Sequence, residues 1–132
     1  MDRTWEEKAC QIITSRHGLP PRGRDWIAAW NSRDLEAVLA MYDEAAEMTS
    51  DRIPAMGFDA SGTLHGKASL RAYWSKALGL LPELHFTLID TFVSPDSVVV
   101  FYANERGKKI CEYLRVNAAG KIVQGSANHL PH

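Results

Sequence analysis

The chain has 132 residues, which suits one domain that buries roughly two-thirds of its unfolded surface, so neither a disulfide nor a metal is required for its stability. Apolar residues make up 45% and charged residues 23% of the sequence, which excludes an intrinsically disordered chain. The formal net charge of -1 comes from 15 basic and 16 acidic residues that are interspersed, so neither nucleic acid nor an acidic membrane is expected as a partner.

The N-terminal segment is predicted to form a packed helix. Thr4 and Glu7 have the spacing of a helix N-cap with a reciprocating carboxylate, and an amphipathic run follows to residue 16. A pair of prolines then ends the helix. We expect a single domain over residues 1–132, of which residues 1–20 are a helical extension.

Motifs for targeting and for cofactor chemistry are missing from the sequence. The N-terminus is charged from its second residue, and no stretch approaches the ~20 apolar residues of a membrane span, so a cytoplasmic location is expected. Cys10 and Cys111 have no Cys or His nearby at metal-ligand spacing, and no phosphate loop, nucleophile elbow or dinucleotide fingerprint occurs. We therefore expect neither a metal nor a cofactor.

Helices are predicted in the first two-thirds of the remaining chain. Apolar residues recur at helical spacing over residues 25–42, with a break near Asn31 that divides the segment into two helical pieces. Residues 43–66 are punctuated by proline and glycine and are expected to hold a short strand at 46–50 and a loop. Helical spacing returns over residues 70–81, where a proline ends the helix.

Strands are predicted for the rest of the chain. Four runs rich in β-branched and aromatic residues are separated by Pro-Asp, Arg-Gly and Ala-Gly turn signals. Helices gathered before an antiparallel meander indicate an α+β fold. The expected strands are residues 84–93, 97–105, 109–116 and 121–129.

Four stretches of the sequence resemble segments of one known family. The first stretch is AWNSRDLEAVLAMYDEAAEMTS at residues 29–50. It matches three consecutive features of the family, which are a helix that begins Trp-Asn-x-x-Asp-Leu, a Tyr-x-x-Asp/Glu turn and a strand that ends in Ser or Thr. A helix with a Gly-x-x-x-Gly-Lys/Arg start and a Tyr-Trp end is matched by GTLHGKASLRAYW at residues 62–74. The third stretch, PELHFTLIDTFVSPDSVVVFY at residues 82–102, matches the family's Pro-x-Leu-x-Phe strand and the hairpin that follows it. The fourth, AAGKIVQGSANH at residues 118–129, matches the last strand, which begins Gly-Lys-Ile. The chain thus resembles the nuclear transport factor 2-like superfamily, in particular its SnoaL-like domains.

This resemblance implies a cystatin-like α+β fold over residues 24–130, in which N-terminal helices pack on a curved, mostly antiparallel sheet and form a cone with one pocket. Members of the family bind small hydrophobic molecules in this cone, and some are isomerases, dehydratases, cyclases or epoxide hydrolases. The epoxide-hydrolase pattern needs an Asp on the last strand, where residues 126–130 of this chain carry no carboxylate. The matched motifs are not catalytic, so they indicate the fold and leave the activity open.

Alternation along the strands predicts which side chains face the pocket, because every second residue of a strand shares a face. On this basis Tyr102, Asn104 and Glu112 converge among apolar neighbours, which is typical of a small-molecule site. The same alternation adds Asn128 from the last strand and Asp90 from the first strand of the meander. The expected ligand-binding residues are Trp30, Tyr42, Met48, Trp74, Phe86, Tyr102, Asn104, Asn128 and His129.

Several of these residues also have a purely structural interpretation. Trp30, Tyr42 and Trp74 lie at helical spacing and fit ordinary core positions equally well. Asp90 lies near the end of its strand, where a carboxylate is commonly solvated. His129 lies near the pocket mouth, yet simple alternation turns it away from the pocket.

Glu112 is the strongest candidate for chemistry, because it lies in the middle of a strand among apolar neighbours. Its carboxyl group must be hydrogen-bonded, by Tyr102, Asn104 or Asn128, or must have a raised pKa, unless the sheet twists enough to place it in solvent. We expect Glu112 and Asp90 to be catalytic, moving a proton on a small hydrophobic substrate without a cofactor. The alternative is a non-catalytic module of the same fold that binds a ligand or dimerises.

A homodimer is also predicted. The strand faces turned away from the pocket are too apolar to remain open to water on a monomer, and members of the family often pair through this face. The residues expected on this face are Val99, Phe101, Tyr113, Val123 and Ala127.

Overall fold

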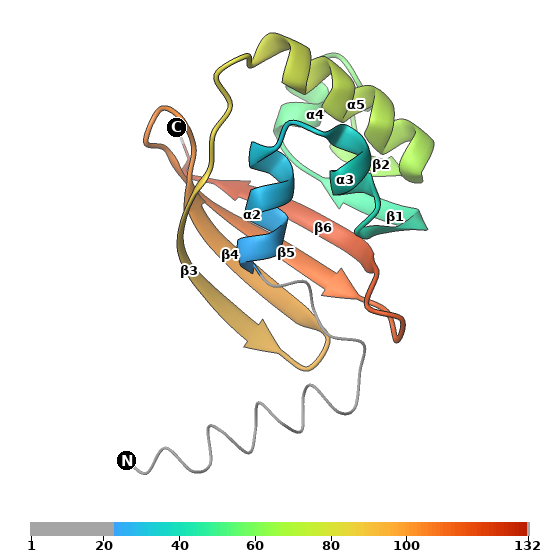
Figure 1. Ribbon diagram of the computed structural model, residues 1–132. Coiled ribbons are helices and arrows are strands. Elements are labelled where there is room, and N and C mark those ends of the chain that lie inside the picture. Colours follow the sequence, from blue (N-terminus) through green and yellow to red (C-terminus); the bar gives the residue numbers. More distant parts are fainter. Residues whose placement is uncertain (1–22, 132) are drawn as a thin grey trace.

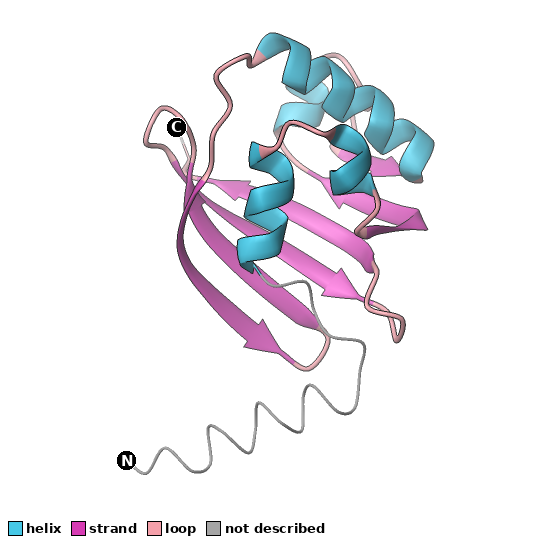
Figure 2. Ribbon diagram, in the orientation of Figure 1, coloured by secondary structure: helices cyan, strands magenta, loops and turns pink. Residues whose placement is uncertain are grey.

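A computed structural model describes residues 23–131, in which helices pack on one face of a curved, six-stranded sheet (Figures 1 and 2). The predicted helix over residues 4–16 lies outside the described residues. The fold is α+β, as predicted from the sequence. Its helices are α2 (Gly23–Asn31), α3 (Leu35–Leu39), α4 (Arg52–Ala55) and α5 (Lys67–Leu80). Its strands are β1 (Tyr42–Thr49), β2 (Thr63–His65), β3 (Thr87–Ser94), β4 (Ser97–Ala103), β5 (Lys109–Val116) and β6 (Ile122–His129).

The sheet has the order β2-β1-β6-β5-β4-β3. Strands β3 to β6 form the predicted antiparallel meander, and β2 pairs antiparallel with β1. Strand β1 pairs with β6 in parallel, so the sheet is mostly, not wholly, antiparallel. Helices α2, α3 and α5 lie over the same side of the sheet, and this inner face contributes the core (Figure 2).

The predicted break near Asn31 is confirmed, because α2 ends there and α3 begins after Asp34. The Asp34 side chain accepts hydrogen bonds from the backbone N–H groups of Glu36 and Ala37, at 3.1 and 3.3 Å, which caps α3. Asn31 binds the backbone of Phe86 in both directions, with its Nδ2 donating to the carbonyl at 2.8 Å and its Oδ1 accepting from the N–H at 2.7 Å. These two bonds fix the end of α2 against the start of the meander.

Three features of the segment after α3 differ from the prediction. Tyr42 does not continue a helix but begins β1, where it pairs with Ile122 of β6. The remaining two features, α4 and β2, fall in the expected loop. Elements of four and three residues are too short to show a hydrophobic period, so the sequence does not reveal them.

The inner faces of the two central strands follow the predicted alternation. Val98, Val100 and Tyr102 of β4 are buried, as are Ile110 and Glu112 of β5. Unbroken pairing from Ser97↔Arg115 to Ala103↔Lys109 keeps these faces in register.

Strand β6 carries an irregularity that reverses its predicted faces. Val116 pairs with Ile122, whereas Arg115 pairs with Gln124, so Val123 is an extra residue on β6. Beyond this point the odd-numbered residues face inward. Asn128 is therefore exposed, and His129 faces the inner side, contrary to simple alternation.

Strand β3 has a similar irregularity at Ile89. Leu88 pairs with Tyr102, but Asp90 pairs with Phe101, which lies on the outer face. The extra residue turns Asp90 away from the inner face, where alternation from Leu88 had placed it. Asp90 is exposed, and its predicted place in the pocket is corrected.

None of the helices within residues 23–131 has the length and apolarity that a bilayer crossing requires.

Candidate functional site

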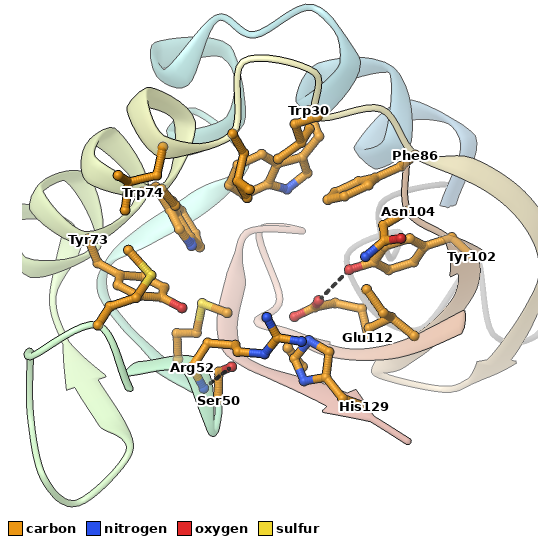
Figure 3. Close-up of a pocket in the computed structure, with 18 of the residues that line it drawn as sticks. Trp30, Ser50, Arg52, Tyr73, Trp74, Phe86, Tyr102, Asn104, Glu112 and His129 are labelled. Carbon is orange, nitrogen blue, oxygen red and sulfur yellow. Dashed lines mark hydrogen bonds between the residues drawn. The ribbon is translucent and has the colours of Figure 1, made fainter. Parts of the chain in front are cut away.

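A cavity of about 310 Å³ lies between the inner face of the sheet and helices α2, α4 and α5 (Figure 3). Its size lies at the lower end of the range found for small-molecule sites. Aromatic side chains form much of its wall. They are Trp26, Trp30, Tyr73, Trp74, Phe86 and Tyr102.

The aromatic wall is held together by ring contacts between separate elements. Trp26 and Trp30 lie one turn apart on α2 and therefore share a face. Trp30 meets Trp74 of α5 edge to face, with ring centroids 5.2 Å apart and planes at 85°. Phe86 contacts Tyr102 of β4, with centroids 4.5 Å apart. These contacts join helices and sheet into one apolar, aromatic surface.

Glu112 lies on the sheet side of this cavity, on the inner face of β5 (Figure 3). Its exposed fraction is 3%, and the Tyr102 hydroxyl donates a hydrogen bond to Oε1 at 3.3 Å. Gly125 of β6 faces the other carboxylate oxygen, because a Cβ atom at this glycine would lie 3.9 Å from Oε2.

Burial raises the pKa of Glu112 to about 8, and the hydrogen bond from Tyr102 lowers this pKa by less. The carboxyl group is therefore mostly protonated at pH 7. The pKa of Tyr102 is also raised well above its ordinary value. Burial is the larger cause, and the negative charge of an ionised Glu112 is the next. A neutral acid and a neutral phenol thus lie side by side in an apolar cavity.

The side of the cavity opposite the aromatic rings is more polar. His129 of β6 is diagonal to Glu112 across the strand pair, because Glu112 pairs with Ala127. Its Nδ1 lies 3.0 Å from Oδ1 of Asp51. Ser50 Oγ accepts from the backbone N–H of Arg52 at 3.1 Å, and the Arg52 side chain extends toward His129 (Figure 3).

Asn104 combines a structural role with a place on the cavity wall. Its Oδ1 accepts hydrogen bonds from the N–H groups of Arg106 and Lys108, at 2.9 and 3.0 Å, and so orders the turn between β4 and β5. Gly107 has φ of +74° in this turn, a conformation that favours glycine. Asn104 therefore fixes the rim of the cavity whether or not it touches a ligand.

The structure brings together eight of the eleven predicted site residues. Three lie elsewhere. Tyr42 is buried in the core behind Trp74, with ring centroids 5.0 Å apart, and its hydroxyl accepts from Trp26 Nε1 at 3.1 Å. Asp90 and Asn128 face away because of the two extra strand residues. The predicted residues that line the cavity are Trp30, Met48, Trp74, Phe86, Tyr102, Asn104, Glu112 and His129.

Several lining residues were missed from the sequence, among them Trp26, Tyr73, Ser50 and Arg52. Trp26 lies four residues before Trp30, and Tyr73 lies four residues before Ala77, which also lines the cavity, so helical spacing could have indicated both. Ser50 and Arg52 lie at the end of β1 and in the short α4, where no periodic signal exists. Tertiary structure alone brings them to the cavity.

The chain is similar to proteins of known structure and to one protein family. The SnoaL-like domain family matches residues 23–125. A SnoaL-like protein of unknown function from Burkholderia thailandensis is 36% identical, with a TM-score of 0.78 over 83% of this chain and 91% of that chain. No curated protein sequence matches the chain.

Two more distant structures contain small molecules. TerC, co-crystallised with polyporic acid, is 18% identical, with a TM-score of 0.67 over 80% of this chain and 86% of that chain. A protein from Catenulispora acidiphila with a ketosteroid isomerase-like fold, in complex with trimethylamine, is 15% identical, with a TM-score of 0.66 over 84% of this chain and 87% of that chain. At these identities the similarity establishes the shared fold.

Proposed function

The chain belongs to the SnoaL-like domain family, as its sequence motifs predicted, and from this premise we propose that its cavity binds a small, largely apolar molecule on which Glu112 acts as a general acid-base residue. The observation that carries the proposal is a buried carboxyl group, hydrogen-bonded by Tyr102, in an aromatic cavity of small-molecule size. A perturbed carboxyl group in such a cavity is typical of functional sites.

The pKa of Glu112, about 8, suits proton transfer near neutral pH. The protonated carboxyl donates its proton to a basic atom of the substrate, such as a carbonyl oxygen. The resulting carboxylate keeps its hydrogen bond from Tyr102 and takes a proton back, either from a substrate carbon or from water. This sequence of transfers needs no cofactor and is common to isomerisation, dehydration and cyclisation.

The proposal draws support from proteins that share the fold. TerC was co-crystallised with polyporic acid, and the Catenulispora acidiphila protein is in complex with trimethylamine. Small-molecule binding is therefore the part of the proposal that the relatives favour.

The alternative function is a non-catalytic module that binds a ligand or forms a homodimer. The outer face of the sheet favours dimerisation, since Phe92 of β3 is 58% exposed and pairs with Val99 of β4. Phe101, Tyr113 and Val123 are partly exposed as well. Ala127, which was expected on this face, lines the cavity instead.

Ligand extraction and proton exchange test the two parts of the proposal separately. Native mass spectrometry of freshly purified protein should show a bound small molecule, which solvent extraction then identifies. When this molecule is incubated with the protein in D2O, NMR should show deuterium entering a carbon-bound position with wild type but not with Glu112→Gln. Equal exchange with both proteins would contradict the catalytic role, whereas a cavity that never holds a ligand would contradict binding.

A further inference from the structure

The mouth of the cavity carries more positive than negative side chains, although the whole chain has a net charge of -1. A groove continues outward from the cavity between the start of α4, the turn between β4 and β5, and the end of β6. Such an excess of one sign raises the local concentration of ligands of the opposite sign. The basic residues of this groove are Arg52, Arg106, Lys108 and Lys109, and the acidic ones are Asp51 and Glu105.

Of the arginines and lysines that line the groove, Arg52 also lines the cavity and so joins the two. The hydrogen bond from its backbone N–H to Ser50 fixes the start of α4. Its guanidinium makes no hydrogen bond to any residue within 23–131, and its ion pair with the adjacent Asp51 is long, at 3.9 Å between Nε and Oδ1. The side chain is 52% exposed, so its donors are open to a ligand. A guanidinium in this state can bind a carboxylate with two parallel hydrogen bonds.

The aromatic side of the cavity offers no comparable site for a charge. It is formed by ring side chains, and the burial that it provides already opposes ionisation of the Glu112 carboxyl. An ion placed there would lose its hydration without gaining a partner. The charged part of a ligand must therefore stay at the mouth while its apolar part enters the cavity.

We infer that the ligand is an organic acid, with an aromatic body inside the cavity and a carboxylate bound by Arg52 at the mouth. This inference rests on the proposed function and names its class of ligand. The carboxylate of such a ligand would lie beside Arg52, and its body would contact the aromatic wall of the cavity.

Two probes of the same shape test the inference. Isothermal titration calorimetry at pH 7 would compare 2-naphthoate with 2-naphthamide, which differ in charge but hardly in size. The carboxylate should bind about tenfold more tightly than the amide. Arg52→Gln should weaken naphthoate binding by about tenfold and leave naphthamide binding unchanged, and Arg52→Lys should restore part of the loss. Arg24→Gln, at an exposed arginine on α2 outside the cavity, serves as the control and should change neither affinity.

The possible failures can be told apart. Equal affinities of the two probes, or an equal effect of Arg52→Gln on both, would overturn the inferred acid and leave the cavity as a site for neutral molecules. If neither probe binds at millimolar concentration, the inferred aromatic acid is wrong, whereas the proposed function fails only if native mass spectrometry also finds no bound molecule.

Discussion

Replacing Glu112 by glutamine should change how the stability of the protein depends on pH. In the folded protein burial raises the pKa of Glu112 from its ordinary value of 4.5 to about 8. Between these two values the unfolded chain has lost the proton and the folded chain still holds it, so the free energy of unfolding decreases as the pH rises. The stability associated with the protonated carboxyl is complete below about pH 4.5 and is lost as the pH passes about 8.

The size of the effect follows from the same two values. Each unit of pKa difference corresponds to about 1.4 kcal/mol, so wild type should lose roughly 5 kcal/mol between the two pKa values because of this one group. Glutamine has almost the shape of the protonated side chain and does not ionise. The Glu112→Gln variant should therefore keep the stability that wild type loses.

Urea unfolding at a series of pH values from about 5 to 9 measures this difference. The stability of Glu112→Gln minus that of wild type should grow by about 1.4 kcal/mol per pH unit and level off above about pH 8. Glu83→Gln, at an exposed glutamate before β3, should follow the wild-type profile and serves as the control. A difference between Glu112→Gln and wild type that stays constant with pH would refute the burial of an ionisable carboxyl at this position.

Three further substitutions have definite expected outcomes. Tyr102→Phe removes the hydrogen bond that lowers the pKa of Glu112, so this pKa should rise further, and an NMR titration of the carboxyl carbon should show its midpoint at higher pH. Asn31→Ala removes both hydrogen bonds to the backbone of Phe86, which should lower the free energy of unfolding by about 2 kcal/mol in urea, and an unchanged midpoint would contradict this account. Sedimentation at micromolar concentration should give a dimer mass for wild type and a monomer mass for Phe92→Glu, and a wild-type monomer would exclude the predicted dimer.

The inner faces of β4 and β5 could be predicted from the sequence because their pairing has no interruption. Every residue from Ser97 to Ala103 has a partner on β5, so one correct assignment of an inward residue determines the whole face. Glu112 and Tyr102 were placed in this way. Their hydrogen bond across the strand pair was one of the alternatives that the sequence left open.

The positions of Asp90, Asn128 and His129 could not be predicted in the same way. One extra residue in a strand, Ile89 in β3 and Val123 in β6, reverses the faces of everything beyond it. Ile89 and Val123 are β-branched residues of the kind common in any strand, so nothing in their own chemistry signals the reversal. Sequence patterns therefore determined the middle of the pocket and failed toward its ends.

The position of Glu112 is explained better by chemistry than by packing. Its single hydrogen bond from a side chain, 3.3 Å long, does not offset the loss of hydration, as the raised pKa shows. Above neutral pH an apolar residue of similar size at this site would give a more stable protein. A fold that needed only a core would gain by such a replacement, whereas a pocket that moves protons needs a group that ionises near neutral pH. The proposed function, in which a bound molecule exchanges a proton with Glu112, therefore accounts for both the destabilising carboxyl and the aromatic cavity around it.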